Sequence, residues 1–432
     1  MTDWQSLQAF DRDHIWHPYA PMPNPQSPLA VQSTQGSRIT LADGRTLIDG
    51  MSSWWAAIHG YNHSDIVAAM HHQIEVMPHI MFGGLTHQPA IDLAQKLVSL
   101  TPEGLEKVFF VDSGSVAMEV AIKMALQYQI SRGKPSKSRL LSIKGGYHGD
   151  TIATMALCDP DNGMHTTFGP LLPQHFFAPR PNPGMINTDD SDIEALEAIL
   201  ATHHDEIAAL TLEPIIQGAG GMRPYRPSYL KQARALCDHY NVLLIADEIA
   251  TGFGRTGELF GCNWAGITPD IMALGKTLTG GHITLAATLA TETVSRTISQ
   301  GDPGLLMHGP TYMGNPLACA TASANIDVLL NSPWQANIAR IEHHFQSQLT
   351  PLKSHEGVKD VRILGAIAAV ELDAGHLGPR IQDLAVEQGV WLRPFGALIY
   401  TMPAYNMPDP SLSQLTDGMV AAITQALDEA QS

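Results

Sequence analysis

The chain reads Leu243-Leu-Ile-Ala-Asp247-Glu248-Ile-Ala-Thr-Gly252-Phe-Gly254-Arg255-Thr-Gly257, a short apolar run that ends in two carboxylates and continues into a glycine-rich loop. An apolar run of this length beside turn residues is typical of a strand covered on both faces. Successive side chains of a strand point to opposite faces, so we expect Asp247 and Glu248 to face opposite ways.

A second apolar run, Pro269-Asp270-Ile-Met-Ala-Leu-Gly275-Lys276, ends in a single lysine. Desolvation beside such a run lowers the pKa of an amine and suits it to Schiff-base formation with a carbonyl. Taken alone, a strand-end aspartate is most often a helix cap and a strand-end lysine is usually solvated. The two together, with the glycine-rich loop between them, form a more specific pattern.

The wider pattern predicts an α/β protein. From about residue 105 to 290, short apolar runs alternate with amphipathic stretches, which favours a mostly parallel sheet with its ligand site at the carboxyl ends of the strands. We predict residues 61–332 as a large domain and residues 333–432 as a smaller α+β domain. Residues 1–60 are predicted as an irregular arm with a short hairpin around Asp43-Gly44, contributing to the small domain.

Composition excludes several classes of partner. The 25 Lys and Arg against 42 Asp and Glu give a net charge of -17, which disfavours nucleic acid and anionic membranes. The four cysteines contain no C-x-x-C pair and the 20 histidines no H-E-x-x-H spacing, so we expect no metal. The start of the chain resembles no export signal and no apolar run approaches about 18 residues, so we expect a cytoplasmic protein.

A phosphate site is expected at Asp112-Ser-Gly114-Ser115-Val116, where a strand gives way to a helix. Small residues let a phosphate approach the backbone, and a helix N-terminus favours an anion. Read alone, this motif is more often a simple helix cap. A P-loop at Gly275-Lys276-Thr277 is disfavoured, because position 270 is aspartate where that motif needs glycine.

Together these motifs, with Gly280-Gly281 after the lysine, resemble the cofactor-lysine signature of the class III aminotransferases, fold type I enzymes of pyridoxal 5'-phosphate. The resemblance implies that Lys276 holds the cofactor as a Schiff base and that Asp247 binds its pyridine nitrogen. It implies a homodimer, because the family contributes residues to the cofactor phosphate from the partner subunit. The remaining implied cofactor residues are Gly114, Ser115, Tyr147, Pro310 and Thr311.

A narrower resemblance is carried by His14-Ile-Trp-His-Pro-Tyr19, by Asp49-Gly-Met-Ser-Ser-Trp54-Trp55, by Met81-Phe-Gly-Gly-Leu-Thr-His87 and by Val390-Trp-Leu-Arg393-Pro. These segments resemble the biotin-pathway branch of the family, which implies S-adenosylmethionine and 8-amino-7-oxononanoate as substrates. Tyr19 is implied to act beside Lys276 in catalysis. Arg393 is the first candidate for the substrate carboxylate and Arg255 the second. The implied substrate-binding residues are Tyr19, Trp54, Trp55, Tyr147, Asp150, Arg255, Gly309 and Arg393.

Alternatives stay open at this point. Another class III ω-aminotransferase, acting on ornithine, 4-aminobutyrate or a diamine, and an aminomutase share the same scaffold. Lysine is an alternative to S-adenosylmethionine as amino donor. A catalytically silent cofactor-binding protein would lack the lysine or the aspartate, and both are present. Glu213 is expected to support the cofactor pocket, in a role that the sequence does not define.

Overall fold

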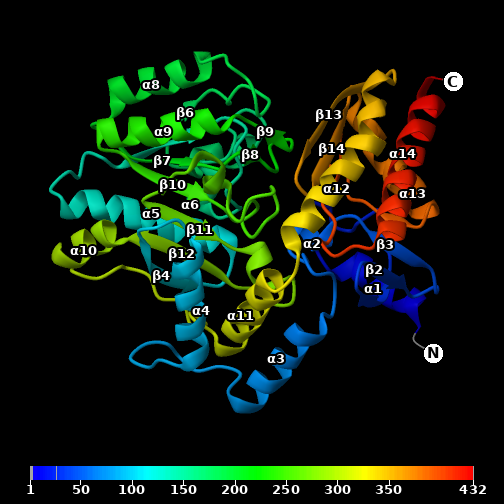
Figure 1. The fold of residues 1–432 in the computed structure, drawn as a ribbon, viewed down its shortest axis with the longest axis horizontal. Coiled ribbons are helices and arrows are strands. Elements are labelled where there is room, and N and C mark those ends of the chain that lie inside the picture. Colours follow the sequence, from blue (N-terminus) through cyan, green and yellow to red (C-terminus); the bar gives the residue numbers. More distant parts are fainter. Residues whose placement is uncertain (1–2, 26, 432) are drawn as a thin grey trace.

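A computed structural model describes residues 3–25 and 27–431, which form two lobes side by side (Figure 1). The larger lobe is built on a seven-stranded sheet of order β4-β12-β11-β10-β7-β5-β6. Only β12 runs against its neighbours, and the other pairs that involve β5, β6, β7, β10 and β11 are parallel. The predicted α/β architecture with a mostly parallel sheet is therefore confirmed. The strands are β4 (Leu105–Val111), β5 (Arg139–Ile143), β6 (Phe176–Ala178), β7 (Ile207–Leu212), β10 (Leu243–Asp247), β11 (Ile271–Leu274) and β12 (Ala286–Thr291).

Helices cover both faces of this sheet, which is why β7, β10 and β11 are buried along their whole length. In β10, Leu243 and Ile245 pack with residues of α5, whereas Leu244 and Ala246 belong to the core on the opposite face. The larger elements around the sheet are α3 (Ser64–Val76), α4 (Gln88–Leu100), α5 (Gly114–Ser131), α8 (Ser191–His203), α9 (Pro227–Tyr240), α10 (Glu292–Gln300) and α11 (Pro316–Leu330). The short ones are α6 (Ile152–Met155), α7 (His165–Phe168), η1 (Gly169–Leu171), β8 (Ile216–Gln217), β9 (Arg223–Pro224), η2 (Gly261–Ala265) and η3 (Lys276–Thr279).

The smaller lobe joins the two ends of the chain. Its four-stranded sheet has the order β1-β2-β3-β15, in which β15 from the C-terminal part pairs in parallel with β3. The strands of the lobe are β1 (Val31–Gln35), β2 (Arg38–Leu41), β3 (Thr46–Asp49), β13 (Val358–Leu364), β14 (Ile367–Leu372), β15 (Val390–Trp391) and β16 (Leu398–Thr401). Its other elements are α2 (Ser52–Trp55), α12 (Trp334–Leu349), η4 (Thr350–Ser354), η5 (Gly375–Leu377), α13 (Gly378–Glu387) and α14 (Asp409–Gln431). The predicted hairpin is confirmed by the antiparallel pairing of β2 with β3.

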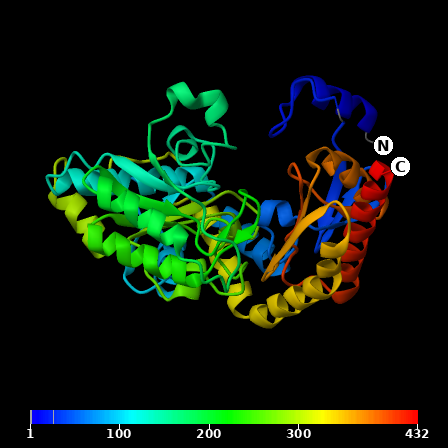
Figure 2. The ribbon, with the colours of Figure 1, turned by 90° about the horizontal axis from the view of Figure 1, so that it is seen from above.

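The N-terminal arm was predicted to be irregular, and this prediction was wrong for residues 4–14. They form helix α1 (Trp4–His14), capped by the Asp3 side chain, which accepts from the amide of Ser6. None of its residues is buried, and Figure 2 shows the helix standing away from the rest of the lobe. Its apolar side chains Leu7 and Phe10, which lie three positions apart, are exposed in the single chain.

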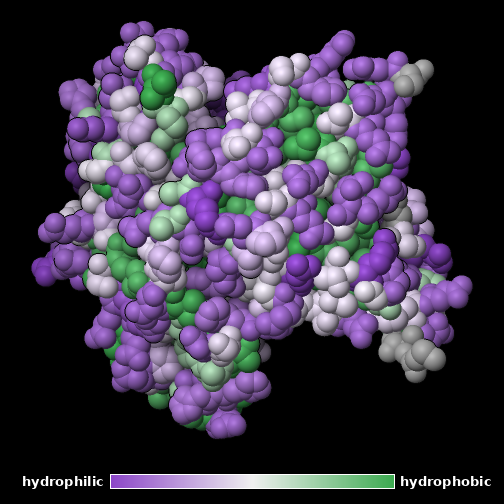
Figure 3. Space-filling view, turned by 45° about the vertical axis from the view of Figure 1, so that its right-hand side comes forward, coloured by the Kyte–Doolittle hydropathy of each residue, from purple (hydrophilic) through white to green (hydrophobic). Residues whose placement is uncertain are grey.

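The face shown in Figure 3 is mostly hydrophilic, with separate apolar patches. No helix within residues 3–25 and 27–431 is long and apolar enough to cross a membrane.

Candidate active site

The catalytic candidates lie where neighbouring parallel strands end. Asp247, the last residue of β10, pairs in register with Ala273 of β11, and Lys276 follows that strand by two residues. The lysine loop lies against the start of α5, since a Cβ built on Gly275 would lie 3.5 Å from the Cα of Gly114. The sheet thus brings Lys276, Asp247 and the N-terminus of α5 to one edge, as the strand pattern predicts.

Lys276 has an apolar and acidic environment. Its Nζ lies 5.4 Å from the centre of the Trp55 ring. Burial lowers the pKa of Lys276, and the nearby carboxylates of Asp247, Glu213 and Asp150 oppose that shift without cancelling it. A lysine with a lowered pKa carries its amine in the nucleophilic, unprotonated form more of the time.

Asp247 is held by a histidine that the sequence analysis did not single out. Its Oδ2 lies 2.8 Å from Nδ1 of His148, and its Oδ1 accepts from the amide of Ile249 at 3.1 Å. Both partners of the pair are buried, at 4% and 3% exposure. Burial opposes protonation of His148, but the hydrogen bond and charge of Asp247 outweigh it, so the pKa of His148 is raised. The protonated ring then donates to Asp247 and fixes the orientation of its carboxylate.

The N-terminus of α5 is formed as an anion site. Ser113 is its N-cap and accepts from the amide of Val116. The Ser115 hydroxyl accepts from the amide of Asp150 at 3.2 Å. Gly149, at φ +125, is needed for this approach, because a Cβ there would lie 2.1 Å from the Ser115 hydroxyl oxygen. The first amides of an 18-residue helix have no partner within the helix and favour a negative charge.

Two tyrosines converge on one carboxylate beside this helix end. The hydroxyls of Tyr147 and Tyr19 each donate at 2.7 Å to a different oxygen of Asp150. Burial is the largest cause that raises the pKa of both phenols, so both remain protonated donors. The main chain of Tyr147 is held in turn by Glu213, whose Oε2 accepts from its amide at 3.1 Å. Tyr19 is 69% exposed in the single chain, in contrast to the partly buried Tyr147.

The two tryptophans occupy a left-handed turn, residues 52–55, which we call the tryptophan turn. Its φ angles are +45, +48, +56 and +81, a conformation that disfavours non-glycine residues by about 1–2 kcal/mol each. Asp49 holds it from below, because its Oδ1 accepts from the amide of Met51 at 2.7 Å. Its Oδ2 accepts from the Tyr61 hydroxyl, which also contacts the Ser53 hydroxyl, both at 2.7 Å. The turn buries Trp55 near Lys276 and leaves Trp54 43% exposed.

Arg255 lies in a different position from the one expected of a substrate anchor. It is fully buried, and its guanidinium donates to the main-chain oxygens of Ala366, Pro403 and Trp55 at 3.3, 2.8 and 3.1 Å. Burial lowers its pKa. Its nitrogens therefore support the tryptophan turn and the small lobe from behind.

Arg393 has the complementary properties. It follows β15, is partly exposed, and makes no hydrogen bond or ion pair with any residue that the structure describes. Burial raises the pKa of Tyr400, and the hydrogen bond from Trp54 and the charge of Arg393 oppose that shift. Arg393 and Trp54 therefore both lie near the Tyr400 hydroxyl. A cation of this kind at the wall of the site is available to a carboxylate.

The segment Gly309-Pro310-Thr311 lies apart from these residues within the chain. Gly309 and Thr311 are exposed, and no contact joins them to Lys276 or Asp247 among the described residues. The segment is tied to α5 through Lys123, whose Nζ contacts His308 at 3.1 Å and the Met307 oxygen at 3.2 Å.

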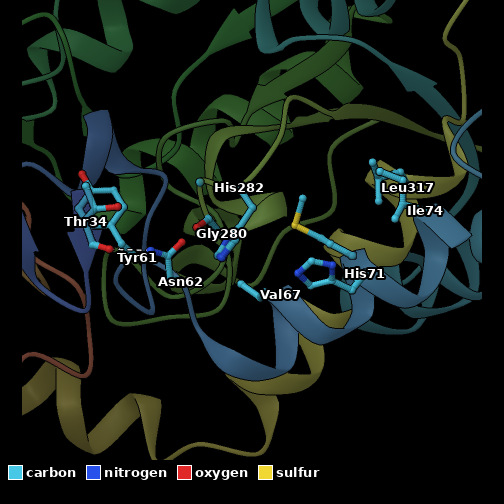
Figure 4. Close-up of a pocket in the computed structure, with 11 residues that line it drawn as sticks. Thr34, Tyr61, Asn62, Val67, His71, Ile74, Gly280, His282 and Leu317 are labelled. Carbon is cyan, nitrogen blue, oxygen red and sulfur yellow. Dashed lines mark hydrogen bonds between the residues drawn. The ribbon is translucent and has the colours of Figure 1, made fainter. Parts of the chain in front are cut away.

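A cavity of about 420 Å³ lies between α3 and the turn after η3. In Figure 4, Tyr61 and Asn62 point into it from one side, and His71 and Ile74 of α3 from the other. It touches neither Lys276 nor Asp247, but Tyr61 links it to the tryptophan turn. Among the residues described, no cluster of three or more His, Cys, Asp or Glu has the arrangement of a metal site.

Sequence reasoning missed His148, Asp49 and Tyr61 as supporting residues. His148 lies between Tyr147 and Asp150, two residues that the sequence analysis did name, and no sequence pattern joins it to the aspartate that it contacts. Asp49 was quoted only as part of a resemblance. His148 is far in sequence from the residue that it supports, because 99 positions separate it from Asp247.

This fold and this arrangement of lysine, aspartate and helix N-terminus define a class of enzyme, and the chain belongs to it: residues 19–423 match the family Aminotransferase class-III. Enzymes of this family depend in general on pyridoxal phosphate. The fold type I assignment is thereby confirmed.

Particular members of the family are similar over nearly the whole chain. The adenosylmethionine-8-amino-7-oxononanoate aminotransferase of Buchnera aphidicola is 50% identical, with 98% of each chain covered. The Mycobacterium leprae enzyme of the same name is 48% identical, with 96% of each covered. The crystal structure of the enzyme of that name from Methanocaldococcus jannaschii has a TM-score of 0.93 at 33% identity, covering 98% of this chain and 99% of the other. An omega transaminase from Pseudomonas jessenii, in complex with PMP, has a TM-score of 0.91 at 30% identity, with 98% of each chain covered.

Proposed function

We propose that this chain is an adenosylmethionine-8-amino-7-oxononanoate aminotransferase. It would move the amino group of S-adenosylmethionine to 8-amino-7-oxononanoate in biotin synthesis, giving 7,8-diaminononanoate. The observation that carries the proposal is the meeting of Lys276, Asp247 and the α5 N-terminus at one sheet edge, in a chain similar over its whole length to enzymes of that name.

The residues of this edge fit pyridoxal 5'-phosphate. Gly114 and Ser115 would hold the phosphate with the first amides of α5, and Asp247 would bind the pyridine nitrogen. The Lys276 amine would hold the aldehyde carbon, and the Tyr147 ring would stack on the pyridine. The group supplies an electron sink that allows the carbon bearing the amino group to lose a proton.

The chain's own residues supply the proton transfer and the positioning. Lys276, with its lowered pKa, would be the base and acid that moves a proton from the amine-bearing carbon to the aldehyde carbon of the cofactor, on the other side of the nitrogen that joins them. Asp247, oriented by His148, keeps the pyridine nitrogen protonated. Tyr19, fixed on Asp150, is placed to orient the amino donor beside the lysine.

The substrate wall is formed by the tryptophan turn and Arg393. The indoles of Trp54 and Trp55 would enclose the aliphatic chain of 8-amino-7-oxononanoate and exclude water. Arg393, free of protein partners among the described residues, would bind its carboxylate through two parallel hydrogen bonds. Both substrates use one pocket in turn, so we expect ping-pong kinetics.

A homodimer is part of the proposal. The segment around Thr311 is exposed and lies among apolar side chains that a single chain leaves in water. His79 and Tyr312 join two parts of this surface, with ring centres 4.6 Å apart. Large exposed apolar side chains favour an interface where they gather, and several follow His79 or flank Thr311 in the sequence. They are Met81, Leu85, Leu305, Met307 and Tyr312.

Two measurements test the proposal. Borohydride reduction of the purified protein should fix a phosphopyridoxyl group on the peptide containing Lys276, and label on another lysine would exclude this assignment. Formation of 7,8-diaminononanoate should then be compared with S-adenosylmethionine, lysine, ornithine and 4-aminobutyrate as donors. We expect S-adenosylmethionine to be the preferred donor. If the protein is labelled on Lys276 but prefers another donor, the assignment to the aminotransferase class stands and the proposed amino donor is wrong.

The second candidate is a general ω-aminotransferase. It is favoured by the likeness to the Pseudomonas jessenii omega transaminase, at a TM-score of 0.91. The general ω-aminotransferase would be the better assignment if simple amines act as donors in this comparison and S-adenosylmethionine does not.

A further inference from the structure

The lysine of the proposed active site has an unfavourable backbone conformation. Lys276 lies at φ +42, in the left-handed region that residues with a side chain rarely adopt. It opens η3, the single turn Lys276–Thr279, which we call the lysine turn. A residue in such a conformation persists only when its surroundings hold it from several sides. The lysine turn therefore needs support from elsewhere in the fold.

A buried asparagine of α11 provides this support. Nδ2 of Asn325 donates to the main-chain oxygen of Thr277 at 2.8 Å and to that of Leu278 at 3.2 Å. These are the two residues that follow Lys276 in the lysine turn. Asn325 is 0% exposed, so water does not compete for its hydrogen bonds. The two carbonyl oxygens also fix the orientation of the amide, because a flipped amide would place its own oxygen against them.

The end of the lysine turn packs directly on this amide. A Cβ built on Gly280 would lie 2.4 Å from Oδ1 of Asn325 and 3.1 Å from its Cγ. Gly280 also lies at φ +60, so both the backbone angle and the close contact require glycine there. The asparagine and the lysine turn therefore fit each other closely, and the amide has little room to move away.

Asn325 also contacts the segment that follows the tryptophan turn. Its main-chain oxygen lies 3.2 Å from Nε2 of His59. Burial lowers the pKa of His59 to about 4, so the ring is neutral and donates to this oxygen from Nε2. His59 follows Trp55 by four positions, and the Trp55 ring is the one that lies 5.4 Å from Nζ of Lys276. One residue of α11 is thus joined both to the turn that carries the amine and to the segment that carries the indole beside it.

We propose that Asn325 is a positioning residue for Lys276, which keeps the lysine turn in its left-handed conformation and so directs Nζ toward the strand end of Asp247. The backbone angles of a residue set the direction of its Cα–Cβ bond and limit its rotamers. A lysine turn that relaxes from φ +42 therefore moves the whole lysine side chain. The consequence for catalysis rests on the proposed function, in which the Lys276 amine holds the cofactor and moves the proton.

The charge state of the amine depends on the same geometry. Burial lowers the pKa of Lys276, and the carboxylates of Asp247, Glu213 and Asp150 oppose that shift. An amine released by a relaxed turn gains contact with water and keeps acidic neighbours, so its pKa should rise toward the ordinary value. The loss of the Asn325 hydrogen bonds should therefore be measurable at Lys276 itself, in addition to its effect on stability.

The test compares two substitutions of Asn325 with a matched control in the full chain. Asn325→Leu replaces the amide by an apolar group of similar shape, and Asn325→Ala leaves the space empty. An effect that both variants share is therefore caused by the lost donor. Thr321→Val is the control, because Thr321 lies one turn earlier in α11, is also 0% exposed, and donates its hydroxyl to Leu317 within the helix. All three variants should lower Tm, since each removes a buried hydrogen bond.

The first readout needs no cofactor. The cofactor-free protein is labelled with traces of acetic anhydride at several pH values, and mass spectrometry of the peptide containing Lys276 gives the titration of this one amine. Both Asn325 variants should move its midpoint to higher pH, by about one unit. Thr321→Val should leave the midpoint unchanged.

The second readout is steady-state kinetics of the cofactor-loaded protein. Both Asn325 variants should lower kcat on the order of 100-fold, because the amine is displaced from the reacting carbons. KM should change much less, because the residues of the proposed substrate wall are retained. Thr321→Val should keep the kcat of wild type.

The proposal is wrong if a folded Asn325 variant has the Lys276 midpoint and the kcat of wild type. It is also wrong if Thr321→Val shows the same shifts, since the effect would then come from general loosening of α11. Failure of the proposed function is seen separately. If borohydride reduction marks another lysine, Lys276 loses its catalytic role, and the acetic anhydride titration still decides whether Asn325 positions it.

Discussion

Arg255 donates from Nη2 to the main-chain oxygen of Trp55 over 3.1 Å, and so fixes the far end of the left-handed tryptophan turn. Asp49 holds the near end through the amide of Met51. Four residues in an unfavourable backbone region persist only when their surroundings determine them from several sides. The shape of the tryptophan turn, the proposed substrate wall, therefore depends on these two charged side chains.

Arg255→Lys should lower stability more than it lowers substrate recognition. A lysine ammonium cannot reach the oxygens of Ala366, Pro403 and Trp55 together, and buried acceptors are left unpaired. We expect a loss on the order of 3 kcal/mol in the free energy of unfolding, seen as a lower Tm in calorimetry. Arg393→Lys is the control, with little change in Tm. An unchanged Tm together with a selective loss of carboxylate binding would restore Arg255 as the substrate anchor.

Arg393→Ala should leave the cofactor spectrum intact and reduce kcat/KM for 8-amino-7-oxononanoate. We expect a loss on the order of 2–5 kcal/mol, because the substrate carboxylate loses a desolvated partner. The methyl ester of the substrate is the internal control. Wild type should discriminate strongly between acid and ester and the variant weakly. Equal discrimination by both proteins would remove Arg393 from this role.

Asp49→Asn should loosen the tryptophan turn. An amide has one acceptor oxygen instead of two, so either the amide of Met51 or the hydroxyl of Tyr61 loses its partner. We expect a shift in tryptophan fluorescence, a higher KM, and a loss on the order of 1–3 kcal/mol in stability. Asp43→Asn, in the exposed hairpin turn, is the matched control. Identical fluorescence for the two variants would contradict the role given to Asp49.

Glu213 should make stability depend on pH. Its folded pKa of about 7 lies above the ordinary value of 4.5, so between these values the unfolded chain loses its proton while the folded chain keeps it. The stability of wild type relative to Glu213→Gln should therefore fall as pH rises through this window, by about 3 kcal/mol in total. Chemical unfolding at about pH 5 and about pH 8 measures it. Glu258→Gln, on the surface, is the control, and a constant difference across the window would refute the prediction.

Thr311 offers a test of the shared site. Lys276→Ala subunits and Thr311→Ala subunits should each be poorly active, and mixing them should give hybrid dimers in which one site has both residues intact. We expect partial recovery of activity, in about half of the hybrid sites, which is about a quarter of all sites when equal amounts of the subunits pair at random. Subunit exchange must be followed with differently tagged chains. Hybrids that form without any recovery would place both residues in the same subunit's site.

Much of the site was predictable because it is local in the sequence. An apolar run that stops at Asp247 and another that stops before Lys276 predict two buried strands, and parallel strands bring their ends to one edge. The helix that starts at Gly114 was equally predictable, since small residues between an apolar strand and an amphipathic stretch mark a helix start. The helix at the N-terminus was not predicted; it buries no residue in the core and is joined to the chain beyond it by the hydrogen bond from Gln8 to the main-chain oxygen of Pro28.

The sequence by itself thus determined the α/β fold, the family, and the residues at the ends of the strands, because apolar periodicity and turn residues act over a few positions. Only the tertiary structure decided which other side chains contact these strand-end residues and support them. His148 reaches Asp247 across 99 positions and Tyr19 reaches Asp150 across 131. It also decided that Arg255 is buried and Arg393 open, although both are single arginines beside apolar runs. The physical reason is that contacts between distant segments, and the sign of φ in a strained turn, follow from how layers pack on one another and have no periodic signal of their own.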